Sequence, residues 1–176
     1  METNWNIDKM HSEVGFKVKH MMITNVSGSF GEFDVKATTQ GDDFSSAQFE
    51  FSAGIDSINT GVADRDAHLK SDDFFNAELY PQLTFKSTEV TKKDDENYVI
   101  SGDLTIRDTT KKVDFIAEFG GIAVDPYGQT KAGLTLSGKL KRSEFGLKWS
   151  AITEAGSIVV SDDIKLQGEI QLIKQA

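Results

Sequence analysis

The polar side chains best placed to do chemistry lie together in one irregular stretch of the sequence. Residues 57–80 show no alternation of apolar and polar residues, and they carry Arg65, Asp66 and His68 within four positions. Irregular segments commonly carry functional groups. Because a guanidinium can bind a phosphate or a carbonyl through paired hydrogen bonds, these residues are candidates for holding the polar end of a ligand. The alternative is a local salt bridge and cap that fixes a short helix to its surroundings.

Side chains for catalysis or metal binding form no recognisable set. His11, His20 and His68 lack the spacing of zinc ligands on a helix or hairpin, and the chain has no cysteine. The sequence contains no G-x-S-x-G, no H-E-x-x-H and no glycine-rich phosphate loop. We therefore predict no catalytic residue, no metal ion and no required cofactor. His20 is either a core residue or a hydrogen-bond partner of a ligand.

Length and charge exclude several classes of protein. The 176 residues suit a single domain with a sizeable core, so residues 1–176 are treated as one domain. The net charge of −9 disfavours nucleic acid and anionic membrane surfaces as partners. No apolar run is long enough for a membrane-spanning helix. Since the first residues show no signal peptide, we expect a cytoplasmic location, or a periplasmic one if a leader has been removed.

The longest regular pattern lies at the end of the chain and predicts a β-strand. From Ile158 to Leu172 every second residue is apolar or small except Asp162, and the residues between them are mostly polar. Successive side chains of a strand point to opposite faces, so this period of two indicates a long, half-buried strand. A β-bulge at Asp162–Asp163 would accommodate the exception.

The same alternation recurs along the chain and predicts about eight amphipathic strands with one short helical insertion near residues 62–76. The segments are residues 12–20, 33–37 after a kink at 28–31, 47–53, 83–87, 98–106, 113–119, 132–140 and 158–172. A sandwich and a closed barrel both fit an all-β chain of this kind. We favour a single eight-stranded antiparallel β-barrel because the long first and last strands can pair and remove both edges.

In each predicted strand the alternate apolar positions form a row that faces the inside of the barrel. Small residues in these inward-facing rows bear on whether the barrel is hollow. Gly102, Gly138 and Gly168 occupy such positions in mid-strand, and the remaining wall is mainly Phe, Leu, Ile and Val. An eight-stranded barrel is either filled by side chains or holds one small ligand. We predict that these glycines leave volume for a long hydrocarbon, whose burial contributes about 0.8 kcal/mol per methylene. Alternatively, the glycines only relieve strain where the strands coil.

Seven short motifs in a fixed order then connect the chain to a known family. With them the chain resembles the YceI-like lipid-binding family, whose members bind polyisoprenoids. The motifs are Trp5-Asn6-Ile7-Asp8 followed by His11-Ser12-x-Val14-x-Phe16-x-Val18-x-His20; Gly28-x-Phe30; Ser57-Ile58-x-Thr60; Arg65-Asp66-x-His68-Leu69-x-Ser71-x-x-Phe74; Tyr80-Pro81-x-Leu83-x-Phe85-x-Ser87; Gly102-x-Leu104-Thr105-Ile106; and Arg142-x-x-Phe145-Gly146.

This resemblance implies an extended, lipocalin-like barrel whose central tunnel takes an isoprenoid chain. It implies that the head group lies near the helical rim, with Arg65, Asp66 and His68 as the head-group or rim residues. The expected bound ligand is an isoprenoid lipid or quinone, or a fatty-acid-like chain. Carried over by position, the tunnel residues are Phe16, Val18, His20, Phe33, Phe49, Phe51, Leu69, Phe74, Phe85, Leu104, Ile106, Phe115, Leu134 and Phe145.

The favoured hypothesis is therefore a soluble carrier or store for an apolar lipid, with no catalysis. One alternative is an enzyme that acts on a lipid inside the barrel, with His20, His68 or Arg65 in the chemistry. Another is a filled barrel that serves as a stress-response or partner-binding module. An isologous homodimer is the default oligomeric expectation.

Overall fold

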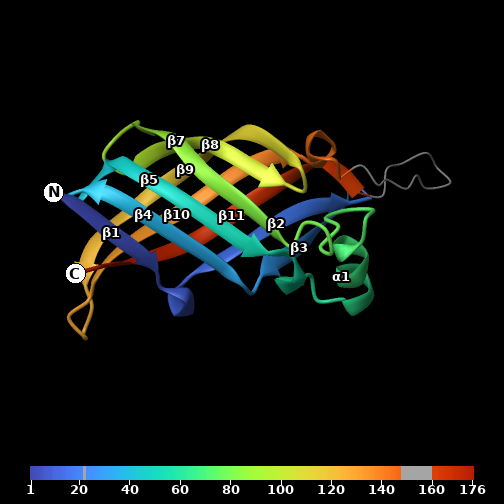
Figure 1. Cartoon of the computed structure of the whole chain (residues 1–176), viewed down its shortest axis with the longest axis horizontal. Coiled ribbons are helices and arrows are strands. Elements are labelled where there is room, and N and C mark those ends of the chain that lie inside the picture. Colours follow the sequence, from blue (N-terminus) through green and yellow to red (C-terminus); the bar gives the residue numbers. More distant parts are fainter. Residues whose placement is uncertain (22, 148–159) are drawn as a thin grey trace.

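Antiparallel strands account for most of the computed structural model, which describes residues 1–21, 23–147 and 160–176 (Figure 1). The strands are β1 (Glu2–Ile7), β2 (Glu13–His20), β3 (Thr24–Phe30), β4 (Phe33–Gln40), β5 (Asp43–Gly54), β6 (Ile58–Asn59), β7 (Gln82–Lys92), β8 (Asn97–Ile106), β9 (Thr109–Val124), β10 (Thr130–Lys141) and β11 (Val160–Lys174). The helical elements are η1 (Lys9–His11), η2 (Ile55–Ser57), α1 (Ala63–Lys70) and η3 (Arg142–Phe145).

Eight strands close into a ring in the order β1-β4-β5-β7-β8-β9-β10-β11, because β11 pairs back with β1. Trp5 lies opposite Lys174 in that pairing, and β2 continues along the same edge of β11 with Phe16 opposite Leu166. The predicted eight-stranded antiparallel barrel is confirmed, and the predicted first strand, β2, pairs with the last strand, but the ring itself closes through β1, which was not predicted. The alternation pattern misses β1 because Trp5 is the one buried residue in that strand.

The expected bulge in the last strand is also present. From Val160 to Ile164, β11 advances four residues opposite two residues of β2. Asp162 lies in this bulge, and its carboxylate accepts hydrogen bonds from the backbone N–H and the hydroxyl of Ser143, both at 2.9 Å. The exception in the apolar pattern is therefore a bulge in a continuing strand. The predicted strand residues 158–159 lie outside the described part of the chain.

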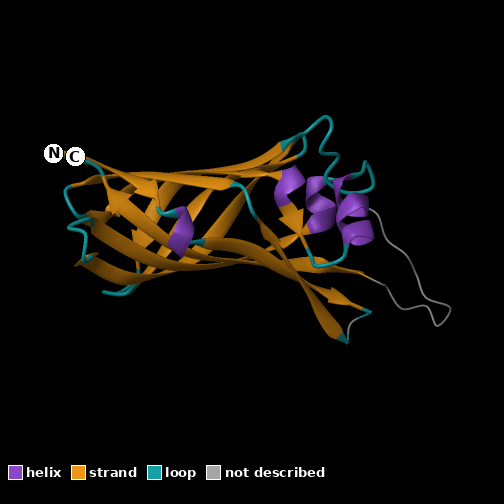
Figure 2. Cartoon of the chain, turned by 90° about the horizontal axis from the view of Figure 1, so that it is seen from below, coloured by secondary structure: helices purple, strands orange, loops and turns teal. Residues whose placement is uncertain are grey.

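The irregular segment covers the end of the barrel that lies opposite the chain termini (Figure 2). Its helix is shorter than the predicted 62–76, because α1 ends at Lys70 and turns follow it. Ser71 ends the helix through two hydrogen bonds to the carbonyl of His68, one from its backbone N–H and one from its hydroxyl. The next strand, β7, begins at Gln82 directly after Pro81 and contains the predicted segment 83–87.

Two of the inward-facing glycines are covered by aromatic rings and leave no free volume. A Cβ atom on Gly102 would lie 2.6 Å from Cζ of Phe85, and one on Gly138 would lie 2.8 Å from Cδ1 of Phe115. Each ring packs over the glycine of the adjacent strand, an arrangement that suits a strongly coiled sheet. The prediction that Gly102 and Gly138 leave room for a ligand is therefore wrong. At Gly168 the nearest atom is 3.6 Å away, so that position does have space.

We expect Gly102→Ala to destabilise the barrel by about 1–3 kcal/mol, because the added methyl group overlaps both the ring of Phe85 and the backbone of β7 at Lys86 and Ser87. Gly133→Ala is the matched control, since a Cβ atom there meets no atom within 4 Å. Urea titration of both variants measures the free energy of unfolding. Equal stability of the two variants would contradict the ring-over-glycine packing.

Candidate functional site

An apolar cavity of about 120 Å³ lies inside the barrel, between its two ends. Its lining consists of apolar residues and glycines apart from Gln167, an exposed residue of the outward-facing row of β11, so a guest there meets almost only hydrocarbon. The lining residues come from β2, β3, β4, β5 and β7 to β11. They are Val14, Gly15, Phe30, Val35, Phe49, Phe51, Leu83, Phe85, Ile100, Leu104, Ile106, Phe115, Leu136, Leu140, Leu166, Gln167, Gly168 and Ile170.

Aromatic side chains fill the barrel between this cavity and the chain termini. The ring of Phe44 lies 5.0 Å from that of Trp5 and 4.9 Å from that of Phe119, measured between centroids. The indole N–H of Trp5 donates to Oγ1 of Thr39 at 2.9 Å, which satisfies the polar atom of this fully buried side chain. The cluster does not line the cavity, so it closes that end of the barrel.

The opposite end is also closed by buried side chains. Ile55, Phe145 and Leu147 belong to segments that follow β5 and β10, and each is at most 2% exposed. None of these three residues lines the cavity. Among the described residues, buried side chains therefore flank the hollow on both sides; it is called the chamber below, and the tunnel stays a prediction.

A second hollow of about 780 Å³ lies at the barrel wall and is bordered mainly by β2, β3, β10 and β11. Strand pairing is interrupted beside it. The β1–β4 ladder ends at the pair Asn6 and Lys36, and the β2–β3 ladder extends only to the pair Gly15 and Ser29. The chamber and this wall hollow share six lining residues, namely Val14, Gly15, Phe30, Leu136, Gln167 and Gly168.

Comparison with known proteins identifies the family. A family model described as the YceI-like domain matches residues 5–172. The chain belongs to the YceI-like family. The predicted resemblance is thus confirmed over nearly the whole chain.

Individual relatives agree with this assignment. The UPF0312 protein of Staphylococcus epidermidis is 35% identical over 170 residues, which cover 96% of each protein. The solved structure of the YceI protein of Campylobacter jejuni is 37% identical and covers 97% of both chains with a TM-score of 0.77. A polyisoprenoid binding domain from Saccharophagus degradans covers 97% of this chain and 98% of its own with a TM-score of 0.70. It is 12% identical, so it shows the shared fold alone.

In this YceI-like chain, six of the fourteen predicted tunnel residues line the chamber, and their role in ligand binding stays a prediction. The six are Phe49, Phe51, Phe85, Leu104, Ile106 and Phe115. Phe33 lines the wall hollow instead. The residues outside both hollows are Phe16, Val18, His20, Leu69, Phe74, Leu134 and Phe145.

Several chamber residues are absent from the predicted set although their positions in the sequence pattern reveal them. Ile100, Leu136, Leu140, Leu166 and Ile170 all fall in the inward-facing rows. They lie outside the residues carried over from the family motifs. The alternation pattern is therefore a better guide to the chamber wall than the motifs are.

Two of the predicted head-group residues are hydrogen-bonded to one threonine. Arg65 donates from Nε to Oγ1 of Thr60 at 2.7 Å and from Nη2 to its carbonyl oxygen at 2.6 Å. Asp66 accepts from the backbone N–H of Thr60 at 2.9 Å. His68 lies 2.8 Å from the carboxylate of Asp73 through Nε2. These contacts fit the structural alternative, in which the helix is fixed to the rim, and the head-group role stays a prediction.

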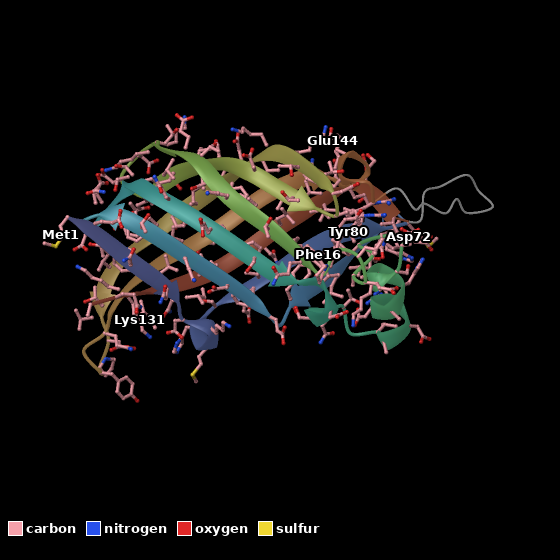
Figure 3. All side chains as sticks on the ribbon, viewed as in Figure 1. Met1, Phe16, Asp72, Tyr80, Lys131 and Glu144 are labelled. Carbon is pink, nitrogen blue, oxygen red and sulfur yellow. The ribbon has the colours of Figure 1, made fainter. Side chains whose placement is uncertain are left out.

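Arg107 is a rim residue that sequence analysis does not single out. It adopts a φ of 55° in the turn between β8 and β9. Its guanidinium donates to the carbonyl oxygens of Asp72 and Phe74 at 3.0 and 3.1 Å, and lies 5.7 Å from the ring centroid of Tyr80. Arg107 thus ties the segment after α1 to the barrel, at the end where Figure 3 labels Asp72 and Tyr80.

The third arginine, Arg142, is buried and holds the bulge of β11. Its Nε donates to the carbonyl oxygen of Ser161 at 2.9 Å, and its Nη1 donates to that of Leu147 at 2.7 Å. Burial lowers the pKa of the Arg142 guanidinium. None of the three arginines lines the chamber or the wall hollow, and each donates hydrogen bonds to backbone carbonyl oxygens of the barrel or of its rim.

A charged cluster fixes η1 at the edge of the wall hollow. Asp8 accepts from the backbone N–H of Met10 at 3.2 Å, and its Oδ2 lies 2.8 Å from Nδ1 of His11 and 2.6 Å from Nζ of Lys131. Lys131, labelled in Figure 3, also lies 3.3 Å from the carboxylate of Asp125. The hydrogen bond from Lys131 is the main cause that lowers the pKa of Asp8, and Asp8 in turn raises the pKa of Lys131.

Residues 1–21, 23–147 and 160–176 contain neither a metal-type cluster of side chains nor a helix able to span a membrane. Within these ranges no three histidine, aspartate or glutamate side chains are grouped so as to hold a metal ion. No helix in the same ranges is long and apolar enough to cross a membrane. The chamber and the wall hollow are therefore the features on which a function can be argued.

We expect Asp8→Asn to destabilise the protein at neutral pH and to destabilise it progressively less as the pH falls below about 3.9. The pKa of Asp8 is lower in the folded than in the unfolded chain. Its stabilising contribution is therefore complete above the unfolded pKa of about 3.9, and it is lost as the pH falls through the folded pKa. Urea unfolding of the wild type and the variant between about pH 7 and pH 2 measures the difference.

The exposed Asp114, changed to Asn, serves as the control for the loss of one carboxylate. We expect its effect on the free energy of unfolding to be small throughout. A destabilisation by Asp8→Asn that stays constant down to pH 2 would show that the carboxylate charge of Asp8 does not stabilise η1.

Proposed function

We propose that this protein binds an isoprenoid lipid or a lipid quinone inside the barrel and carries or stores it without chemical change. The observation that carries the proposal is the chamber itself, in which Gln167 is the one polar residue among eighteen lining residues. An empty apolar space forfeits dispersion contacts that a hydrocarbon guest restores. Water gains little there because the lining offers it too few hydrogen-bond partners.

The size of the chamber limits what enters it. A cavity of about 150 Å³ lined by apolar side chains accepts benzene, so the 120 Å³ chamber suits a group of about the size of one isoprene unit. The rings of Phe85 and Phe115 meet edge to face at 5.0 Å on its wall. A longer chain needs these walls to move apart, or it continues into the adjacent wall hollow.

The fold neighbours support the same class of ligand. The domain from Saccharophagus degradans is described as polyisoprenoid binding, and this chain shares its fold. Because function belongs to sites rather than to folds, the likeness supports the proposal only together with the apolar chamber. Both point to a branched hydrocarbon rather than to a polar small molecule.

The side chains around the guest favour binding over catalysis. Gln167 carries a neutral amide, which is neither a nucleophile nor a general acid or base. The residues that an enzyme hypothesis would use, His20, His68 and Arg65, do not line the chamber. A guest held there lies among hydrocarbon side chains, so we propose that it leaves chemically unaltered.

We expect Gly168→Leu to abolish lipid binding while the barrel still folds. A Cβ atom on Gly168 would lie 3.6 Å from the carbonyl oxygen of Glu13 and 3.7 Å from Cγ1 of Ile170, which are ordinary contacts. The rest of the leucine side chain would occupy the chamber. Organic extraction of the purified protein followed by mass spectrometry identifies the bound lipid, and titration with geranylgeraniol should show an affinity at least tenfold lower.

Gly133→Leu is the matched control, because a Cβ atom there meets no atom within 4 Å and Gly133 lines neither hollow. It should bind like the wild type. Circular dichroism reports whether both variants keep the fold. The proposal fails if a folded Gly168→Leu variant retains its lipid, or if the wild type neither co-purifies with an isoprenoid nor binds geranylgeraniol.

A further inference from the structure

The barrel wall contains an interruption that is built into the hydrogen-bond pattern. On one edge, the backbone N–H of Asp8 donates to the carbonyl oxygen of Gln171 at 2.8 Å, and Ser12 accepts from the N–H of Gln171 at 2.9 Å. On the other edge, the N–H of Gly31 donates to the carbonyl oxygen of Ser57 at 3.1 Å. These backbone groups form their hydrogen bonds with partners other than the opposite edge of the gap. No backbone hydrogen bonds of this kind therefore join the two edges.

This interruption, here called the side opening, lies between η1 and the junction of β3 with β4. Its borders in the wall hollow are Lys9, Ser12 and Val14 on one edge and Phe30, Gly31 and Phe33 on the other. Val14 and Phe30 also line the chamber. At the side opening, the same residues therefore border both the exposed wall hollow and the chamber.

In the described part of the chain, both ends of the barrel hold buried side chains in the way of a guest. The cluster around Trp5 and Phe44 fills the end with the termini, and Phe145 and Leu147 are buried at the end with α1. Passage through either end would displace several close-packed side chains, each of which contributes to stability. Passage through the side opening moves chiefly the ring of Phe30, which borders both spaces.

We propose that the apolar guest enters and leaves through the side opening, and that its polar end stays in the wall hollow while its chain lies in the chamber. This inference rests on the proposed function, since it names the route and the head-group site of the same ligand. It also explains how a chamber of about 120 Å³ serves a longer molecule, because the adjacent hollow of about 780 Å³ takes the remainder.

The side chains of the wall hollow define the chemistry of the head group. Most of its polar side chains are hydroxyls and amides, such as Ser12, Asn59 and Gln167. Its charged side chains are one lysine and two glutamates, Lys9, Glu13 and Glu169. A surplus of negative charge opposes a phosphate, whereas hydroxyls and amides bind neutral donors and acceptors. The structure therefore favours an alcohol, a phenol or a quinone as the head group.

Gly31→Cys allows the side opening to be blocked chemically. The chain has no cysteine, so a maleimide reagent would react at this position alone. Gly31 is exposed, and a Cβ atom there meets no atom closer than 3.8 Å, so the substitution should leave the fold intact. We expect fluorescein maleimide at this site to slow the uptake of radiolabelled farnesol at least tenfold, measured by rapid gel filtration. The unlabelled variant should match the wild type.

Gly133→Cys with the same label is the control for the effect of the dye, because Gly133 lies outside both hollows. Its uptake of farnesol should be unchanged by labelling. Uptake by labelled Gly31→Cys at the rate of labelled Gly133→Cys would overturn the side opening as the route. Failure of the wild type to bind farnesol at all would instead count against the proposed function.

A comparison of farnesol with farnesyl diphosphate on the wild type tests the head-group part of the inference. The two molecules share one hydrocarbon chain and differ in the charge of the polar end. We expect farnesol to bind at least tenfold more tightly at equilibrium. Equal or tighter binding of the diphosphate would overturn the assignment of a neutral head group.

Discussion

The need to pair both edges of one curved sheet shapes the whole barrel. β11 has 15 residues, and its free edge is shared between β1 with 6 residues and β2 with 8 residues. Between these two strands the chain leaves the ladder as η1. Gln171 of β11 keeps both of its backbone groups bonded there, through Asp8 and Ser12. β11 thus has no unpaired backbone at Gln171.

Because β1 and β2 share the edge of β11 with η1 between them, the wall is interrupted on the side of η1 that faces away from β11. Where the chain forms η1, it does not pair with the junction of β3 and β4. The β1–β4 ladder therefore stops before η1, and the β2–β3 ladder begins only after it. The charged cluster of Asp8, His11 and Lys131 holds η1 in this position. The side opening is therefore a consequence of how the barrel closes, and it lies where the chamber comes nearest to polar surface.

Most of the polar residues that attract attention in the sequence support the frame of the barrel. Arg65 and Asp66 both bind Thr60, Arg107 binds carbonyl oxygens of the segment after α1, and Arg142 binds those around the bulge of β11. Charged groups that bind the backbone in this way position loops with several directed hydrogen bonds. The chamber is left to apolar side chains, which suits a guest recognised by its shape and its aversion to water.

The sequence by itself determined most of the strands, the barrel and the family, because a period of two specifies which face of each strand is buried. It did not reveal β1, whose pairing with β11 closes the ring. Three features depended on the tertiary structure. The alternation pattern shows that Gly102 and Gly138 face inward, but it cannot show what packs against them. In the structure the rings of Phe85 and Phe115, from neighbouring strands, cover the two glycines. Sequence spacing could not show that Arg107 reaches a segment more than thirty residues earlier in the chain. The side opening likewise depends on which residues of neighbouring strands are paired. The hydrogen-bonded ladder ends where two strands no longer lie opposite each other, and this register is a property of the tertiary structure.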